Sequence, residues 1–396
     1  MKGLKVLNRM NKKGNAAMVA LLVMIIIVGV AAIVMVLAGR NSIDEEEKFK
    51  QNSTTSTQTT APVVTSATTP TTPAVVDLYP KNDPSFKNTS IKDFGSDASL
   101  LVDLDTDTIL AGSNINKRIY PASLTKVMTI LVAAENLRSY DDTYTFKDSD
   151  FTKLVEEKAS MAGFKPGEKV VAKDLFYGAI LPSGADAVVG LENLVAGSEK
   201  NFVKLMNDRA KELGLKNTHF VNGTGIHDPN HYTTAADMAV IMKVANHNIT
   251  CKNVMNTFDY TTSRTTQNPE GIHLTCLLGG RLSGYYVDKN GNGANDDNVK
   301  ILGGKTGFTN EACYCVATTC EDTSTGHTFV CITIKSPTDK QAILDTISMY
   351  EKYLPGSKAK IPDAEVTTTA ATAKQEGVTT AATKKAAAVT TKKKAA

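Results

Sequence analysis

A run of 24 residues without a charge, from Ala16 to Gly39, places the strongest limit on what this chain can fold into. The run consists of Val, Ile, Met, Leu, Ala and two Gly. A helix needs about 20 such residues to cross a bilayer. A helix of this composition has no polar face to turn toward water, which disfavours a core helix of a soluble domain. We therefore expect a transmembrane helix over residues 16–39.

The charges that flank this run predict its orientation. Residues 1–15 carry five Lys or Arg and no acid, whereas residues 44–47 are all acidic. By the excess of Lys and Arg on the cytoplasmic side, we expect a cytoplasmic basic segment over residues 1–15, with the rest of the chain outside the cell membrane. A cleaved signal peptide ending at Ala38 is the alternative, but the apolar part of such a peptide is normally about 7–15 residues long.

Two further segments are unsuited to a packed core. Residues 52–73 hold 13 Ser or Thr, three Pro and no charge, so we expect a Ser/Thr/Pro-rich linker over residues 40–83. Thr, Ala and Lys make up 25 of the last 31 residues, and we expect a disordered basic tail over residues 356–396. The tail is either a tether to an anionic wall polymer or a solvated extension without a specific role.

The charge of the chain argues against nucleic acid as a partner. The whole chain carries only +3, and residues 1–40 and 366–396 contribute +6 and +5, so residues 41–365 carry −8. No segment combines a basic stripe with aromatic residues that would stack on bases. We therefore expect no nucleic-acid partner.

Residues 84–355 have the composition of one ordinary globular domain. Two strands joined by a turn are predicted within residues 99–111. Further along, the periodicity predicts helices at 188–195, 201–213 and 235–245, strands at 312–319 and 328–334, and a last helix at 340–353. Because strands occur at both ends of this α+β order, the first and last elements must share one sheet.

Ser123 stands three residues before Lys126 at the start of a further predicted helix. Two side chains at this spacing share one face of a helix. A neutral lysine amine there can accept the serine proton, and free N–H groups at the helix N-terminus can stabilise a nearby oxyanion. An S-x-x-K pair occurs by chance in many sequences, so it needs support from other motifs.

Two more motifs give that support. Lys305-Thr306-Gly307 follows a predicted strand entry whose glycines let a ligand approach the backbone. A lysine there would disfavour protonation of Lys126. The other motif, Ser183-Gly184-Ala185, lies between an apolar run and a helix. Together, the order S-x-x-K, S-G-x and K-T-G is that of the penicillin-interacting serine enzymes.

With these residues the sequence resembles the serine D-alanyl-D-alanine carboxypeptidases, the low-molecular-weight penicillin-binding proteins of the peptidase S11 type. The resemblance covers about residues 98–354. Besides the motifs, it is carried by Tyr120 to Thr129, Phe164 to Glu168, Leu213 to Phe220 and His231 to Met238. It implies the α+β fold of serine β-lactamases and DD-peptidases, an antiparallel sheet flanked by helices plus an all-helical subdomain, with the active site between them.

The resemblance implies three catalytic residues. Ser123 would attack a peptidoglycan stem peptide that ends in D-Ala-D-Ala, and water would release the resulting acyl-enzyme. Lys126 would be the base that activates the serine, and Ser183 would pass a proton to the leaving amine. β-lactams are the expected covalent inhibitors, and no cofactor or metal is implied.

The resemblance also implies a substrate-binding strand, made of Lys305, Thr306, Gly307 and Phe308. Lys305 would orient and polarise the substrate, and Thr306 would bind its terminal carboxylate. The backbone N–H groups of Ser123 and Phe308 would form the oxyanion hole.

Two positions depart from the family pattern. The third residue of the second motif is usually Asn, and here it is Ala185, so an amide is missing; the loss costs about 1–3 kcal/mol if its partner stays unpaired. A catalytically weak or inactive wall-binding homologue is therefore an alternative. The arginine that contacts the carboxylate in many members has its nearest match in Lys340, which lacks the bidentate fork.

Two rival enzymes are weaker readings of the same residues. A class A β-lactamase needs a further glutamate, but the candidate Glu212, with Asn217, falls in a stretch that matches the carboxypeptidases. A zinc peptidase built on His227 and His231 is disfavoured because Pro229 would break the helix that such a pair requires. We expect these histidines to be structural residues of a loop.

Two other patterns leave alternatives open. Residues 288–293 match the first positions of a calcium loop, but Val299 stands where a glutamate belongs, which favours a hairpin loop at the mouth of the site. Six cysteines allow fifteen pairings. The sequence does not choose between disulfides, such as Cys315 or Cys320 with Cys331, and buried free thiols.

Overall fold

A six-stranded sheet organises the fold of the computed structural model, which describes residues 78–89, 94–295 and 298–358. The order in the sheet is β1-β3-β2-β10-β9-β8. The strands are β1 (Lys81–Asn88), β2 (Ala98–Asp103), β3 (Thr108–Ser113), β8 (Val299–Thr309), β9 (Cys313–Asp322) and β10 (His327–Ser336). All neighbours pair antiparallel except β1 and β3, which are parallel. Because β2 pairs with β10, the prediction that the first and last elements share one sheet is confirmed.

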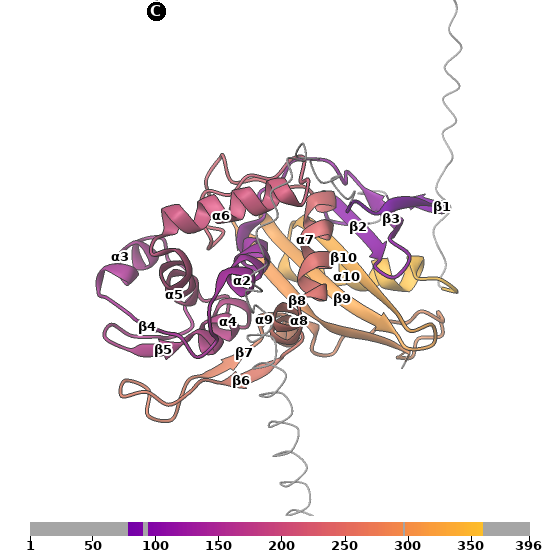
Figure 1. Cartoon of the computed structure of the whole chain (residues 1–396). Helices are drawn as coiled ribbons and strands as arrows, with labels where there is room; N and C mark the ends of the chain where they lie inside the picture. Colours follow the sequence, from indigo (N-terminus) through magenta and orange to yellow (C-terminus); the bar gives the residue numbers. More distant parts are fainter. Residues whose placement is uncertain (1–77, 90–93, 296–297, 359–396) are drawn as a thin grey trace, which may run out of the picture. The chain divides into compact units, whose positions relative to one another are not determined.

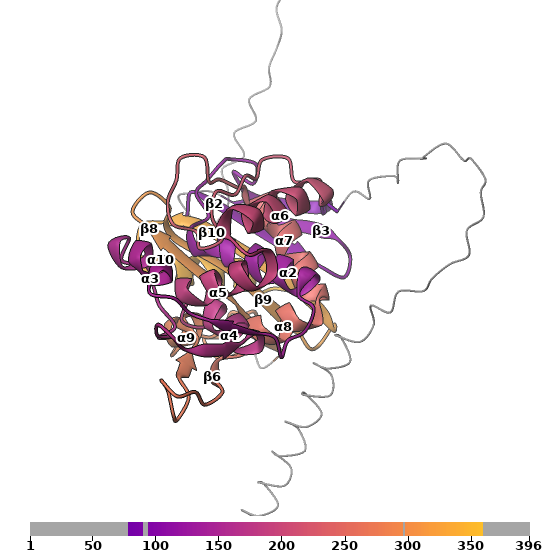
Figure 2. The ribbon, with the colours of Figure 1, turned by 60° about the vertical axis from the view of Figure 1, so that its left-hand side comes forward.

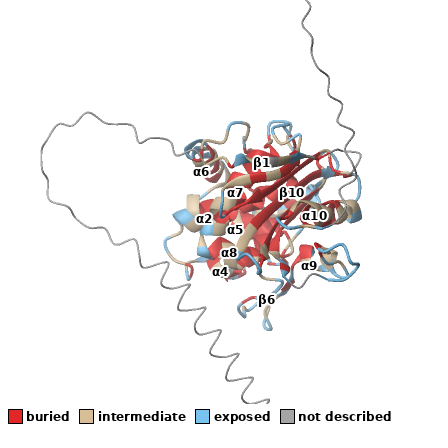
Figure 3. Cartoon of the chain, turned by 90° about the vertical axis from the view of Figure 1, so that its right-hand side faces the viewer, coloured by how far each residue is buried: buried red, intermediate tan, exposed pale blue. Residues whose placement is uncertain are grey.

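The central strands are buried on both faces, which explains why their apolar residues do not alternate with polar ones. All six residues of β2 are buried. Helix α10 (Asp339–Tyr353) covers one face of the sheet, and α2 (Thr125–Asn136) and α7 (Ala235–His247) lie on the other (Figures 1 and 3). The sheet is therefore the middle of three layers.

A mainly helical part packs beside the sheet, around α2 (Figure 2). Its helices are α3 (Ser149–Glu156), α4 (Ala172–Ile180), α5 (Ala185–Ala196), α6 (Glu199–Glu212), α8 (Ile249–Met255) and α9 (Leu277–Leu282). It also contains two short antiparallel strand pairs, β4 (Thr143–Thr145) with β5 (Lys169–Val171) and β6 (Asp259–Thr261) with β7 (His273–Thr275). The expected all-helical subdomain is thus helical with two small ribbons.

The predicted helices form close to their predicted bounds because their starts are encoded locally. The side chains of Ser198, Thr234 and Thr338 each accept the N–H three residues ahead, at the starts of α6, α7 and α10. Such a cap supplies a partner for an N–H group that has none inside the helix.

Strand β1 begins at Lys81, inside the segment expected to be linker. It contains Pro84 and two lysines and pairs on one side only, with β3. Proline and charge are tolerated on an edge strand, because one side needs no ladder partner. These same features hide the strand from a search for alternating apolar residues.

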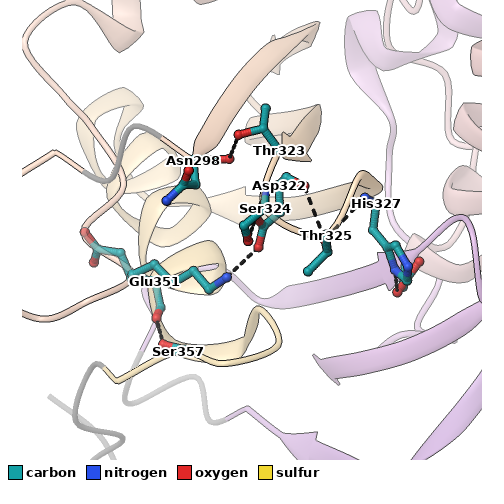
Figure 4. Close-up of polar contacts among 10 residues, drawn as sticks. Asn298, Asp322, Thr323, Ser324, Thr325, His327, Glu351 and Ser357 are labelled. Carbon is teal, nitrogen blue, oxygen red and sulfur yellow. Dashed lines mark hydrogen bonds and ion pairs between the residues drawn. The ribbon is translucent and has the colours of Figure 1, made fainter.

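A buried ion pair links the C-terminal end of β9 to the loop that leads into β8. Lys289 Nζ bonds the carboxylate of Asp322, which is fully buried at the end of β9. The other oxygen of Asp322 accepts the N–H of Ser324 at 3.0 Å (Figure 4). The N–H of Lys358 donates to Lys289 O at 2.9 Å, so the end of the described chain is attached at the same place.

The loop with the partial calcium pattern is stabilised by hydrogen bonds between the Asp288 side chain and its own backbone. The two carboxylate oxygens of Asp288 accept the N–H groups of Asn292 and Gly293, at 3.1 and 2.6 Å. This loop joins α9 to β8, so it is not the turn of a hairpin. Asp296, another acid further along this segment, lies outside the described residues.

The six cysteines are all free thiols, and all except Cys313 are buried. The suggested pairing of Cys315 or Cys320 with Cys331 is therefore not formed. No helix within the described ranges has both the length and the apolar character needed to cross a membrane. The expected transmembrane helix, most of the linker and nearly all of the tail lie outside those ranges.

Asp322→Asn is expected to lower the free energy of unfolding by about 3 kcal/mol, because it leaves the Lys289 ammonium buried without a charged partner. Urea denaturation of the full chain measures the change. Glu321→Gln, at the half-buried neighbouring position of β9, is the control and should stay within about 0.5 kcal/mol of the parent. Equal stability of the two variants would contradict the role given to the ion pair.

Candidate active site

Ser123 lies where a turn of 3-10 helix, η1 (Ala122–Leu124), runs into α2. Lys126 Nζ donates to Ser123 Oγ at 3.1 Å and to the carbonyl oxygen of Thr224 at 2.6 Å. The predicted serine–lysine pair is therefore in hydrogen-bond contact. Ser123 is half-buried and Lys126 is almost fully buried, so the amine faces the serine from inside the protein.

Two glycines allow backbone segments to close around the turn that carries Ser123. A Cβ on Gly225, which has φ +81°, would lie 2.0 Å from the carbonyl oxygen of Ala122. A Cβ on Gly307 would lie 3.1 Å from Ser123 N. Ala122 itself has φ +48°, a left-handed conformation that costs energy for a residue with a side chain. The position of Ser123 is thus set by contacts from both sides.

The second lysine also lies inside the protein. Lys305 is 1% exposed, in β8 at the edge of the sheet, and its Nζ donates to the carbonyl oxygen of Thr306 at 2.8 Å. Burial lowers the pKa of Lys305 well below its ordinary value, and the charge of Lys126 lowers it further. Thr306 is buried too, whereas Phe308 is 47% exposed.

The pKa of Lys126 lies near physiological pH, for a different main reason from the one expected. Burial lowers the pKa of Lys126 to about 7, and the carboxyl groups of Asp186 and Glu192 oppose that change. From the sequence we expected repulsion from Lys305 to be the cause of the lowered pKa. Desolvation of the ammonium is instead the dominant effect.

Ser183 is buried with φ +64°, and its Oγ has no hydrogen-bond partner among the described residues. One loop, residues 157–168 between α3 and β5, holds the motif in place. The N–H of Ala185 donates to Ser160 O at 2.7 Å, and the carboxylate of Asp186 accepts the N–H groups of residues 162, 163 and 164. A buried hydroxyl without a partner is costly unless a ligand satisfies it.

Ala185 stands where the sequence pattern led us to expect an amide side chain. It is the first residue of α5 and is 1% exposed. Its methyl group offers no hydrogen bond to a substrate or to a lysine.

The histidine pair does not form a metal site. His231 is buried, its Nδ1 accepts the N–H of Val221 at 3.2 Å, and its Nε2 lies 2.8 Å from Thr125 Oγ1. Burial lowers the pKa of His231 to about 4, so the ring is neutral and its Nε2–H donates to the threonine. His227 stacks edge-on against Tyr120 instead. Both ring nitrogens of His231 are used within the protein, in keeping with the structural role expected.

Sequence reasoning missed two charged groups of the site. Glu192, on α5, is 1% exposed and interacts electrostatically with Lys126. The sequence signal that could have identified it is an acidic residue on the buried side of an otherwise apolar helix. Arg281, on α9, lies close enough to lower the pKa of Lys305. The weak candidate Lys340 is exposed in the first turn of α10. Glu212, the β-lactamase candidate, is exposed and pairs with Arg209.

The stretch at 213–220 is hydrogen-bonded to the stretch at 231–238. The carboxylate of Asp237 accepts the N–H of Asn217 at 2.8 Å and the hydroxyl of Thr218 at 2.7 Å. The same stretch leads into residues 222–225, which contact Lys126 and the turn before Ser123. These segments therefore support the site without taking part in it.

Comparison with known proteins adds three findings. The family model described as D-alanyl-D-alanine carboxypeptidase, peptidase S11, matches residues 85–335. The D-alanyl-D-alanine carboxypeptidase DacF of Bacillus subtilis is 35% identical over 235 residues, which are 58% of this chain and 55% of that protein. A D-alanyl-D-alanine carboxypeptidase of a Streptomyces species is 32% identical over 219 residues, 53% of this chain and 71% of that protein.

The fold is likewise similar to that of a solved enzyme. The crystal structure of the Streptomyces K15 DD-transpeptidase superposes with a TM-score of 0.55 at 29% identity, over 66% of this chain and 98% of that one. The chain spans about half the length of two curated relatives that it matches: 55% of DacF, and 40% of the D-alanyl-D-alanine carboxypeptidase DacC of Escherichia coli, to which it is 38% identical over 158 residues. The similarity therefore covers the part of the chain that contains the sheet, the helical part and the site.

Gly225→Ala is expected to destabilise the protein by about 3–5 kcal/mol, because the added methyl group combines a left-handed backbone with a clash against Ala122 O. Gly197→Ala is the matched control: it also has positive φ, but nothing lies within 4 Å of the new Cβ. Its cost should be about 1 kcal/mol. Urea denaturation compares the two variants, and equal costs would refute the close approach at Gly225.

Proposed function

We propose that this chain, which belongs to the D-alanyl-D-alanine carboxypeptidase family (peptidase S11), is a serine carboxypeptidase acting on peptidoglycan stem peptides that end in D-Ala-D-Ala. The observation that carries the proposal is the 3.1 Å hydrogen bond between Lys126 Nζ and Ser123 Oγ. Burial lowers the pKa of Lys126 to about 7, so that amine can act as a base near neutral pH.

The first half of the proposed reaction forms the acyl-enzyme. Lys126 takes the proton of Ser123 Oγ, and the oxygen attacks the carbonyl carbon of the penultimate D-Ala. The negative charge of the tetrahedral intermediate lies on the carbonyl oxygen, where the N–H groups of Ser123 and Phe308 are proposed to donate. The close packing of Gly307 on Ser123 N supports this placement, since it brings β8 against the serine.

The second half releases the products. The C–N bond breaks as Ser183 passes a proton to the departing D-Ala amine. Water then attacks the acyl group, and Ser123 leaves as the restored hydroxyl. The buried Oγ of Ser183, which lacks a partner among the described residues, suits a group that bonds only in the presence of substrate. Lys305 is proposed to orient and polarise the substrate, and Thr306 to bind its terminal carboxylate, with Arg281 adding positive charge nearby.

A fluorescent penicillin should label the full chain covalently at Ser123, since a β-lactam presents a strained amide to the same nucleophile. Peptide mass mapping locates the label, and Ser123→Ala should remove it. Incubation with a pentapeptide ending in D-Ala-D-Ala should release one D-Ala. A folded parent chain as blank as Ser123→Ala in both assays would instead favour the non-catalytic wall-binding alternative raised by Ala185.

The rate of acylation should rise with pH through a midpoint near 7, because only neutral Lys126 accepts the proton. Lys126→Ala should lower the rate by at least about 100-fold, the contribution typical of general base catalysis. Stopped-flow measurement with a chromogenic β-lactam over a pH series gives both results. A rate that does not change with pH in the parent would rule out Lys126 as the base.

We also propose that residues 16–39 anchor the protein in the cell membrane, with residues 1–15 in the cytoplasm and the carboxypeptidase domain outside. The uncharged run of 24 residues and its basic N-terminal flank support this topology. The six lysines of residues 366–396 are proposed to contact an anionic wall polymer. Protease treatment of intact and lysed cells would test the topology, since only the outer domain is accessible before lysis.

A further inference from the structure

A buried carboxyl group that the reaction above does not use lies behind Lys126. Glu192 is 1% exposed in α5, and its Oε1 accepts the N–H of Gly223 at 3.1 Å. The carbonyl oxygen of the next residue, Thr224, accepts a hydrogen bond from Lys126 Nζ at 2.6 Å. One short backbone segment, 223–224, therefore connects the carboxyl of Glu192 with the catalytic amine.

Glu192 also lines a cavity of about 180 Å³. Its walls include Glu192 and Thr224, and also Lys153 and Glu199, an exposed ion pair with 3.6 Å between Nζ and Oε2. Neither Ser123 nor Lys305 lines it. The cavity thus borders Glu192 on the side of α3 and does not include the reacting serine.

The surroundings of Lys126 and Glu192 favour a single proton shared between the two side chains. Burial and the nearby charge of Glu199 raise the pKa of Glu192 to about 8, while Lys153 and Lys126 oppose that rise. The groups that act on Lys126 are Asp186 and Glu192, both from α5, and Lys126 in turn faces Lys305 from β8. An isolated charge in such a site is costly, whereas a pair of opposite charges is less so.

We propose that Glu192 is a positioning residue that controls the proton on Lys126 and keeps the charge of the buried site constant during the reaction. When Lys126 accepts the Ser123 proton and becomes an ammonium, the Glu192 carboxyl releases its own proton to solvent through the cavity. When Lys126 gives up its proton, Glu192 takes one back. This role rests on the proposed function of Lys126 as the base.

The test is the pH dependence of acylation by a chromogenic β-lactam, measured on the full chain. Glu192→Gln keeps an acceptor for the Gly223 N–H but has no charge. Without the carboxylate, Lys126 loses its proton at lower pH, so the midpoint of the acid limb should move down by about one pH unit. Glu192→Ala should move it in the same direction. Glu192→Asp retains the charge and should restore the parent midpoint.

Glu168→Gln is the matched control. Glu168 is also 1% exposed and hydrogen-bonded, to Thr265 and Asn268, but it does not act on Lys126. This variant should keep the parent midpoint even if its stability falls. An unshifted midpoint in Glu192→Gln, with the parent chain acylated normally, would overturn the inference and leave the proposed function intact. Failure of the parent to be acylated would instead count against the proposed function.

A second measurement tests Glu192 without any activity. A carboxyl whose folded-state pKa is raised stabilises the protein fully below its ordinary pKa, and this contribution is lost as pH rises through about 8. The melting temperature of Glu192→Gln, relative to that of the parent, should therefore increase as the pH rises from about 5 to about 9. Parallel curves for the two chains would show that Glu192 does not exchange its proton in this range and would also overturn the inference.

Discussion

The site depends on how closely the backbone of β8 approaches the turn that carries Ser123. A Cβ atom at Gly307 would already be in tight contact with Ser123 N. On the opposite side of the turn, Gly225 packs directly on the carbonyl oxygen of Ala122. These contacts bring a nucleophile from the helical part beside lysine and threonine groups from the edge of the sheet. A side chain at either glycine would force the two parts of the site apart.

Burial around that contact explains the chemistry of the lysines. Lys126 and Lys305 are almost fully enclosed, and removal from water disfavours their charged forms. The carboxyl groups of Asp186 and Glu192 act in the opposite direction on Lys126. The balance leaves the pKa of Lys126 at about 7, where a small change in a neighbouring charge alters the fraction of neutral amine. This sensitivity is why a carboxyl behind the site matters to the reaction.

Elements with a strong local signal were predictable. Helices α5, α6, α7 and α10 have apolar periodicity, and three of them have a capping side chain at the start. Strands β2, β9 and β10 are long or apolar. Strand β1 and the two small ribbons were not predicted, because β1 contains Pro84 and charges and the ribbon strands have only three residues each. Such strands are stabilised by their partners, which lie far away in the sequence.

The sequence by itself determined the identity and order of the candidate reacting groups, because one turn of helix places Lys126 beside Ser123 whatever the rest of the fold does. Only the tertiary structure decided that Lys305 and Lys126 lie close enough to interact, that His231 is a neutral support for Thr125, and that Arg281 acts on Lys305. It also brought Glu192 behind Lys126. The burial of a side chain and the charges around it depend on every segment that packs against it. These segments lie far apart in the sequence, so no local pattern of residues predicts their combined effect.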